Sequence, residues 1–222
     1  MADDFSTVRA RMVQQIEAEM RAIGNMLGKS ELAIPVINAV STVLRHEFVP
    51  DDMRTSAYLN RPLSIGFGQT ISQPFIVAVM TDMLGFKSNA RVLEVGTGCG
   101  YQTAVLAELA REVFSVERVP ELAETAEIRL RELAYDNVQV CCGDGWSGWP
   151  EHAPYNAIVV TAAAVEVPEA LVDQLRPSGR LVIPIGAPGS TQFLTLVEKD
   201  GDGTIRELIG LPVAFVPLVK SG

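Results

Sequence analysis

The sequence predicts an α/β fold centred on a doubly wound, mostly parallel β-sheet, with helices before the sheet and an antiparallel end after it. From residue 91 onward, short apolar runs alternate with helical stretches, a pattern that is typical of doubly wound sheets. The first runs are almost continuously apolar, as in parallel strands that are covered on both faces. A glycine-rich stretch at residues 96–100 joins the first run to the helix that follows it.

The first part of the chain is predicted to be helical. Apolar residues recur at helical spacing between Val8 and Ile23. Ser30 is predicted to cap a second helix that begins at Glu31 and holds Pro35 in its first turn.

The middle and the end of the chain supply the sheet and its covering helices. Residues 64–73 are predicted as a loop, and a helix is expected from Pro74 through Leu84. Strands are predicted over residues 91–95, 113–117, 138–141, 157–161 and 180–184, and helices over residues 101–110, 120–133 and 168–175. Two further runs, 192–198 and 205–219, flank a turn and are predicted to be antiparallel.

Length and composition favour one folded domain. The 222 residues are 48% hydrophobic, which is enough to build a core and excludes bulk disorder. We predict a single domain over residues 1–222, with a helical N-terminal extension at 1–62 and a core for cofactor and substrate at 63–222. The net charge of −9 disfavours non-specific nucleic-acid binding, which needs a basic surface.

The remaining composition argues against disulfides, metal sites and membrane insertion. Cys99, Cys141 and Cys142 are an odd number for disulfides, and with two histidines they make a poor zinc site. The start of the chain lacks the pattern of a secretory signal, and the uncharged residues 62–81 hold too many polar and helix-breaking residues to span a membrane. We therefore expect a cytoplasmic protein with reduced thiols.

The glycine loop at residues 96–100 carries the clearest chemical signal. Gly96, Gly98 and Gly100 let the backbone turn tightly and let a ligand approach without Cβ atoms in the way. Glu117 closes the next predicted strand, where an acid can accept both hydroxyl groups of an adenosine ribose. The pattern predicts an adenosine-containing cofactor.

A nicotinamide dinucleotide and S-adenosylmethionine both fit this pattern, and the details favour the second. The dinucleotide fingerprint needs a glycine where this chain has Tyr101, and Glu94 before the loop discourages a pyrophosphate. S-adenosylmethionine carries a sulfonium and an ammonium but no phosphate, so an acid-rimmed loop suits it. Asp144 follows the third predicted strand, where it is expected to flank the adenine. Alone, Glu94 or Glu117 is more simply interpreted as a solvated charge at a strand end, but the three acids together favour the cofactor.

Further motifs follow one another in order from about residue 46 to residue 218. Before the glycine loop they are residues 46–50, Tyr58, 61–63, 65–66 and 68–74. After it they are residues 117–118, 120–123, 137–138, 143–145, 148–150, 161–164 and 215–218. By these motifs the chain resembles the protein-L-isoaspartate O-methyltransferases, a family of class I S-adenosylmethionine-dependent methyltransferases. The run at 69–74 is the most discriminating, because general methyltransferases do not carry it.

The resemblance implies an enzyme with a Rossmann-like core that methylates the free carboxyl group of L-isoaspartyl residues, and to some extent of D-aspartyl residues, in damaged proteins and peptides. The cofactor would be S-adenosyl-L-methionine, and S-adenosyl-L-homocysteine its product. The methyl ester then closes to a succinimide without help from the enzyme, and hydrolysis returns some normal aspartate. We expect a monomer that binds neither nucleic acid nor a membrane.

The resemblance also assigns roles to single residues. Ser72 is expected to be catalytic, because its hydroxyl can orient the attacking carboxylate, which is already ionised at neutral pH and needs no general base. The expected cofactor-binding residues are Gly68, Gln69, Thr70, Glu94, Gly96, Thr97, Gly98, Gly100, Glu117, Arg118, Gly143, Asp144 and Gly145. Without the resemblance, Ser72 would be interpreted as a cap of the helix that Pro74 starts.

Three positions depart from the family pattern. Ala214 stands where bacterial members often have Arg, and this change is expected to alter substrate affinity or selectivity. Asn156 and Ser178 stand where Asp and Gly are common.

The alternative functions are a methyltransferase for a small-molecule carboxyl group or another substrate, and a module that binds without turnover. An adenine-N6 DNA methyltransferase is disfavoured, because residues 161–164 lack its Pro-Pro-aromatic motif.

Overall fold

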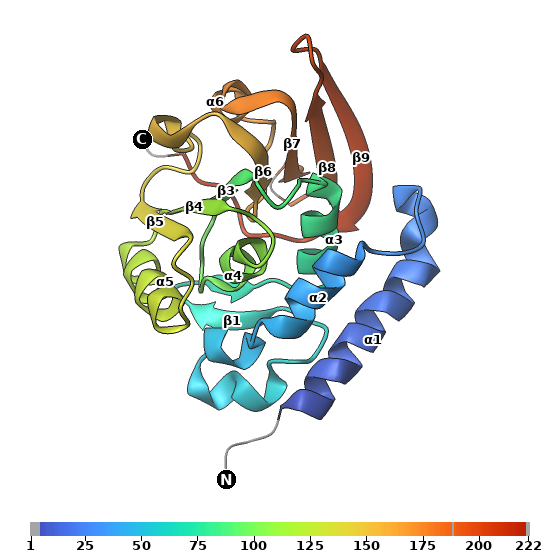
Figure 1. Ribbon diagram of the computed structural model, residues 1–222, viewed down its shortest axis with the longest axis vertical. Helices are drawn as coiled ribbons and strands as arrows, with labels where there is room; N and C mark the ends of the chain where they lie inside the picture. Colours follow the sequence, from blue (N-terminus) through green and yellow to red (C-terminus); the bar gives the residue numbers. More distant parts are fainter. Residues whose placement is uncertain (1–4, 188, 221–222) are drawn as a thin grey trace.

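The computed structural model describes residues 5–187 and 189–220 and confirms the α/β fold (Figure 1). A seven-stranded sheet has the strand order β5-β4-β3-β6-β7-β8-β9. Its strands are β3 (Arg91–Val95), β4 (Glu112–Glu117), β5 (Val138–Cys142), β6 (Tyr155–Val160), β7 (Leu175–Ile185), β8 (Gln192–Lys199) and β9 (Ile205–Val213). The pairs from β5 to β7 are parallel, whereas β8 is antiparallel to both β7 and β9, as predicted.

The apolar central strands explain why helices cover both faces of the sheet. β3, β4 and β6 are buried along almost their whole length, so both of their faces must be shielded from water. The covering helices are α3 (Pro74–Leu84), α4 (Tyr101–Ala107), α5 (Pro120–Glu132) and α6 (Glu169–Asp173). β3 pairs with β4 on one side and with β6 on the other, and ligands of α/β proteins bind at the carboxyl ends of strands where the order reverses in this way.

The elements before the sheet are α1 (Ser6–Ile23), η1 (Gly24–Leu27), α2 (Ile34–Thr42), η2 (Arg45–Phe48) and η3 (Asp51–Ser56). The second helix forms, but its predicted start at Glu31 with a Ser30 cap is wrong, because α2 begins later and its N-cap is Ala33. The Ala33 N–H donates to Asp82 Oδ1 at 2.7 Å, which ties the start of α2 to α3. Pro35 lies in the first turn of α2, as predicted.

Residues 64–73, predicted as a loop, contain a β-hairpin. β1 (Leu63–Gly66) pairs antiparallel with β2 (Gln69–Ile71). Phe67 and Gly68 at the tip have φ angles of 53° and 70°, the left-handed backbone that tight hairpin turns require. Strands this short show too little alternation to be recognised from the sequence.

The last predicted strand, 205–219, is too long, because β9 ends at Val213. The chain then crosses the carboxyl ends of the strands, and we name residues 214–219 the crossing segment. Gln192 holds its start with two hydrogen bonds. Its Nε2 donates to the Phe215 carbonyl at 3.0 Å, and its Oε1 accepts from the Phe215 N–H at 2.6 Å.

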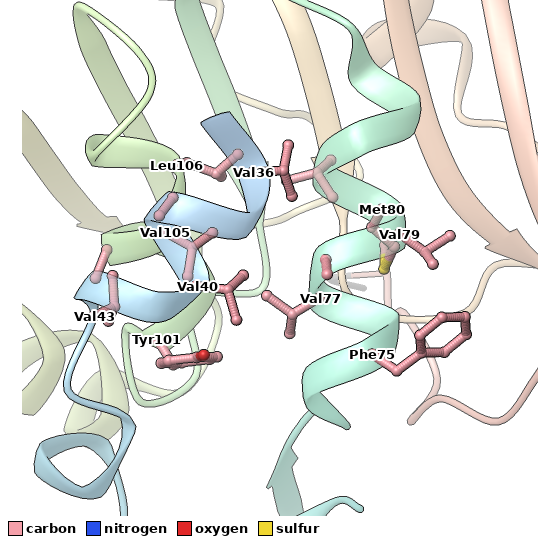
Figure 2. Packing of buried hydrophobic residues seen from close by; sticks show 14 of the residues in the cluster. Val36, Val40, Val43, Phe75, Val77, Val79, Met80, Tyr101, Val105 and Leu106 are labelled. Atoms are coloured by element: carbon pink, nitrogen blue, oxygen red, sulfur yellow. The ribbon is translucent and has the colours of Figure 1, made fainter. Parts of the chain in front are cut away.

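A large hydrophobic cluster joins α2, α3 and α4 on one face of the sheet (Figure 2). Val40 from α2, Val77 from α3 and Leu106 from α4 are each at most 1% exposed. A second cluster lies around β3, β4, β6 and α6. Because α3 and α4 begin next to the hairpin and the glycine loop, this packing also fixes the two segments that carry the candidate site.

Leu106→Ala is expected to lower the free energy of unfolding by about 2–5 kcal/mol, because the smaller side chain leaves a cavity in the cluster. Denaturant-induced unfolding followed by circular dichroism measures this loss. Leu208→Ala is the matched control, since Leu208 is 53% exposed, and its effect is expected to stay within about 0.5 kcal/mol. Equal losses in the two variants would contradict this packing.

Candidate functional site

A pocket opens at the carboxyl ends of β3, β4 and β6, where the strand order reverses. It holds about 720 Å³ of space, its open mouth included, and we name it the main pocket. The predicted cofactor residues that line it are Gln69, Thr70, Gly96, Gly98, Glu117, Arg118 and Gly145. The hairpin, the glycine loop and the ends of β4 and β5 therefore meet around one cavity.

Close packing explains the glycines in the floor of the main pocket. Gly96 has a φ angle of 97°, and a Cβ on it would lie 2.4 Å from Thr161 Oγ1. That hydroxyl donates to the Gly96 carbonyl at 2.6 Å. A Cβ on Gly145 would lie 2.5 Å from Cγ1 of Val95. Any larger residue at either position would displace these neighbours, so both positions need glycine.

Glu117 ends β4 and ties two loops together at the edge of the main pocket. Its side chain is mostly buried; Oε2 accepts from the Gly98 N–H at 2.8 Å, and Oε1 accepts from the Val119 N–H at 2.9 Å. Each carboxylate oxygen has further lone-pair capacity. Glu117 can therefore hold both loops and still accept hydrogen bonds from the hydroxyl groups of a ligand.

Glu94 does not rim the pocket, because its side chain is fully buried beneath the glycine loop. Its Oε2 accepts hydrogen bonds from the hydroxyls of Thr103 and Ser115, the latter at 2.6 Å. Its Oε1 has no hydrogen-bond partner among the described residues. Burial raises the pKa of Glu94 to about 8, although the two hydroxyl donors oppose the rise. Near neutral pH, Glu94 is thus a largely uncharged support for the loop and gives little attraction to a cationic ligand.

The other predicted cofactor residues lie close to the main pocket without lining it, as far as the described residues show. Gly143 and Asp144 belong to the loop after β5, and Gly68 lies at the tip of the hairpin. Gly100 is the N-cap of α4, with a φ angle of 92°. Thr97 lines a smaller cavity beside the main pocket.

That smaller cavity, the inner pocket, lies between the hairpin and the glycine loop. Its lining includes Ser72, Thr97, Cys99, Tyr101 and Gln102. A third cavity, the outer groove, is lined by residues that include Pro62, Ser72, Ile76, Ala214 and Phe215. Ser72 lines both of these cavities, and Thr70 lines all three.

Ser72 therefore lies where the outer groove meets the inner pocket. The helix-cap interpretation of Ser72 is wrong, because Gln73 is the N-cap of α3 and no side chain caps that helix. Arg45 Nη2 donates to the Ser72 carbonyl at 2.8 Å. The Ser72 hydroxyl makes no hydrogen bond to another described residue. It can therefore donate to a carboxylate that enters from the groove.

The crossing segment closes the main pocket, a role that is not predicted from the sequence. The Ala163 N–H donates to the Val216 carbonyl at 2.8 Å, and the Leu218 N–H donates to the Ala163 carbonyl at 2.7 Å. Nε1 of Trp146 also donates to the Leu218 carbonyl, at 3.2 Å. The motif at 215–218 could have indicated that this segment belongs to the site. Its composition is typical of a strand, however, so the sequence does not predict that it forms a wall of the pocket.

Other chemically active side chains serve the fold. His46 bonds to the Tyr58 hydroxyl at 2.7 Å and stacks on Phe5. Burial raises the pKa of the Cys99 thiol, which disfavours the reactive thiolate. The described residues include no group of His, Cys, Asp and Glu that could hold a metal ion, and no helix of the length and apolarity needed to cross a bilayer.

Glu94→Gln is expected to change how stability depends on pH. Because the pKa of Glu94 is raised from 4.5 to about 8, the folded protein keeps a proton that the unfolded chain has lost between these values. The contribution of Glu94 to stability therefore falls as pH rises through this window. Gln mimics the neutral acid, so the advantage of the variant over wild type should grow, by an amount on the order of a few kcal/mol, between about pH 5 and pH 9. Thermal unfolding at several pH values measures this, and a constant difference would contradict it.

Sequence comparison relates the chain to one family of known proteins. A family model described as protein-L-isoaspartate(D-aspartate) O-methyltransferase matches residues 27–222. Protein-L-isoaspartate O-methyltransferase 2 of Syntrophobacter fumaroxidans is 56% identical over 216 residues, which are 97% of this chain and 87% of that protein. Protein-L-isoaspartate O-methyltransferase 1 of Cupriavidus necator is 53% identical over 219 residues, which are 98% and 85% of the two chains.

Solved structures share the fold. A protein-L-isoaspartate O-methyltransferase superposes with a TM-score of 0.80 at 28% identity, covering 94% of this chain and 65% of that longer one. A Plasmodium falciparum chain, described as a protein-L-isoaspartate O-methyltransferase in complex with S-adenosyl-L-homocysteine, superposes with a TM-score of 0.73 at 28% identity, covering 85% of this chain and 92% of that one. Since the matched range of the family model includes the hairpin, the glycine loop and the crossing segment, the chain belongs to the protein-L-isoaspartate(D-aspartate) O-methyltransferase family.

Proposed function

We propose that this protein transfers the methyl group of S-adenosyl-L-methionine to the free carboxyl group of L-isoaspartyl residues in damaged proteins and peptides. The observation that carries the proposal is the position of Ser72, at the junction of the outer groove and the inner pocket. Membership of the family and the names of the relatives support the substrate class. Because the family description includes D-aspartate, we propose D-aspartyl residues as second substrates.

The donor set of the main pocket suits this cofactor. Glu117 offers acceptors for ribose hydroxyls, and Val95, Val116 and Val119 offer apolar walls for an adenine. Arg118 is the one basic side chain among the described lining residues, which suits a cofactor without phosphate. When bound, S-adenosyl-L-methionine supplies an electrophilic methyl group on a positively charged sulfur.

The chain's own residues then have to bind, align and dehydrate the attacking group. An isoaspartyl carboxylate is ionised at neutral pH, so no side chain has to remove a proton. The inner pocket agrees with this, because burial raises the pKa of Cys99, and that of Tyr101 to about 12, which keeps both groups neutral. Ser72 donates a hydrogen bond to one carboxylate oxygen and leaves the other free to attack, while the hairpin and the crossing segment limit access of water.

The outer groove is where the peptide around the reacting residue would lie. Its lining residues include Pro62, Ile76 and Phe215, and none of the described lining side chains carries a charge. Ala214 is part of this lining, so the Arg that bacterial relatives often have there would project into the same groove. We propose that the altered selectivity expected from Ala214 arises here, through weaker recognition of charged flanking residues. The expected monomer and the expected cytoplasmic location stay predictions.

Gly96→Ala is expected to weaken binding of S-adenosyl-L-homocysteine by at least roughly 10-fold, since the new methyl group would collide with Thr161 and strain the backbone. Isothermal titration calorimetry measures the dissociation constant. Gly201→Ala is the control, because a Cβ there would meet no atom within 4 Å. Unchanged affinity in folded Gly96→Ala protein would contradict the assignment of the main pocket.

Wild-type protein is expected to transfer labelled methyl groups to a peptide with L-isoaspartate and not to the same peptide with L-aspartate. Ser72→Ala should lower kcat/KM for the isoaspartyl peptide by roughly 10- to 100-fold, the value of one hydrogen bond to a charged group. Ser41→Ala, at an exposed position of α2, is the matched control.

Each outcome of this assay distinguishes the candidate functions. Base-labile label on the isoaspartyl peptide alone supports carboxyl methylation. If wild-type protein binds S-adenosyl-L-homocysteine but labels neither peptide, the proposed substrate is wrong, and a small-molecule substrate or a non-catalytic role takes its place. If Ser72→Ala retains full activity, Ser72 has no catalytic role.

A further inference from the structure

Arg45 is a buried cation directly behind Ser72. Its side chain, in the short helix η2, is 0% exposed. Nε donates to the Ala57 carbonyl at 2.7 Å, and Nη2 donates to the Ser72 carbonyl at 2.8 Å. The rigid guanidinium thus links the end of η3 to the turn that carries the candidate catalytic hydroxyl.

The positive charge of Arg45 has no negative partner among the residues that the structure describes. The ion pairs formed by the described residues do not include Arg45, and its Nη1 has no hydrogen-bond partner among them. The guanidinium lies 4.7 Å from the ring centre of Tyr101. Its other titratable neighbours are Cys99 and Tyr58. Burial raises the pKa of these three groups, so none of them carries a negative charge at neutral pH.

A buried charge without a partner is costly, and proteins rarely keep one unless something compensates it. Arg45 stays protonated even when burial lowers its pKa, because a guanidinium holds its proton across the physiological range. Two of its neighbours, Tyr101 and Cys99, line the inner pocket, and Ser72 lines the inner pocket and the outer groove. Arg45 itself does not line any of the three cavities, so an anion bound at the Ser72 hydroxyl would lie near this cation without touching it.

We propose that Arg45 is a positioning residue for the reaction, which fixes Ser72 through its carbonyl and attracts the substrate carboxylate through the Ser72 backbone. The inference rests on the proposed function, because the attracted anion is the isoaspartyl carboxylate. Arg45 does not form a direct ion pair with the carboxylate oxygens. The substrate carboxylate is therefore attracted to the site and can still react.

The two roles of Arg45 predict different variants. Arg45→Gln removes the charge, so it should weaken binding of the carboxylate and raise KM for the peptide. Arg45→Lys keeps the charge but cannot bond both carbonyls in the same planar geometry, so it should lower kcat and leave KM closer to that of wild type.

The decisive experiment compares two peptides that differ only in the charge of the reacting group, one with L-isoaspartate and one with L-isoasparagine. Dissociation constants are measured by calorimetry in the presence of S-adenosyl-L-homocysteine, so that no methyl transfer occurs. Arg45→Gln should weaken binding of the isoaspartyl peptide by roughly 10-fold and change binding of the isoasparaginyl peptide by less than about 2-fold. Arg45→Lys should keep the wild-type ratio of the two constants.

Arg180→Gln is the matched control, because it removes one positive charge where Arg180 pairs with Glu198 at 2.7 Å on the antiparallel part of the sheet. Its ratio of the two dissociation constants should equal that of wild type. Binding of S-adenosyl-L-homocysteine by each variant establishes that the variant is folded.

A measurement on wild-type protein keeps the test independent of how the variants fold. A buried cation is poorly screened, so the preference for the isoaspartyl peptide should persist from low to high salt. Equal weakening of both peptides in Arg45→Gln, or a preference that vanishes at high salt, would overturn the electrostatic role of Arg45. Absence of methyl transfer by wild-type protein would overturn the proposed function as well, so the two failures are distinguishable.

Discussion

The rest of the site depends on the two hydrogen bonds that the Glu117 carboxylate accepts. At the ends of β3 and β4 the chain leaves the sheet toward α4 and α5, and the peptide N–H groups of these turns have lost their partners in the sheet. Glu117 accepts from one N–H group in each turn. One side chain thereby fixes the glycine loop, the start of α5 and the wall of the main pocket at the same time. The acceptor capacity that its two oxygens keep at the pocket edge is a by-product of that structural task, and hydroxyl groups of a ligand can donate to it.

The sheet and the glycine loop could be predicted because their signals are local. Continuous apolar runs give strands such as β3 and β6, and Gly96 directly follows one of them, so the ligand-binding end of the sheet can be read from periodicity alone. Glu117 could be placed by the same logic, since a residue that closes a parallel strand lies at the same edge as the loop after its neighbour.

The remaining features depend on contacts between residues far apart in the chain. A buried arginine such as Arg45 looks like a surface residue in the sequence, and its partners at Ala57 and Ser72 cannot be found by spacing. Glu94 has the sequence context of a residue at the rim of the pocket, but the hydroxyls of Thr103 and Ser115 hold it below the loop. The crossing segment has the composition of a strand, and only the bonds from Gln192 and Ala163 show where it leaves the sheet.

The crossing segment also has a consequence for how the protein is made. The main pocket joins Gln69 of the hairpin to Leu218, so residues separated by most of the chain must meet before it exists. A chain that is still emerging from the ribosome lacks the wall that residues 216–219 provide. Domains generally fold as units. Closure of the main pocket therefore waits until this late segment of the chain has been made.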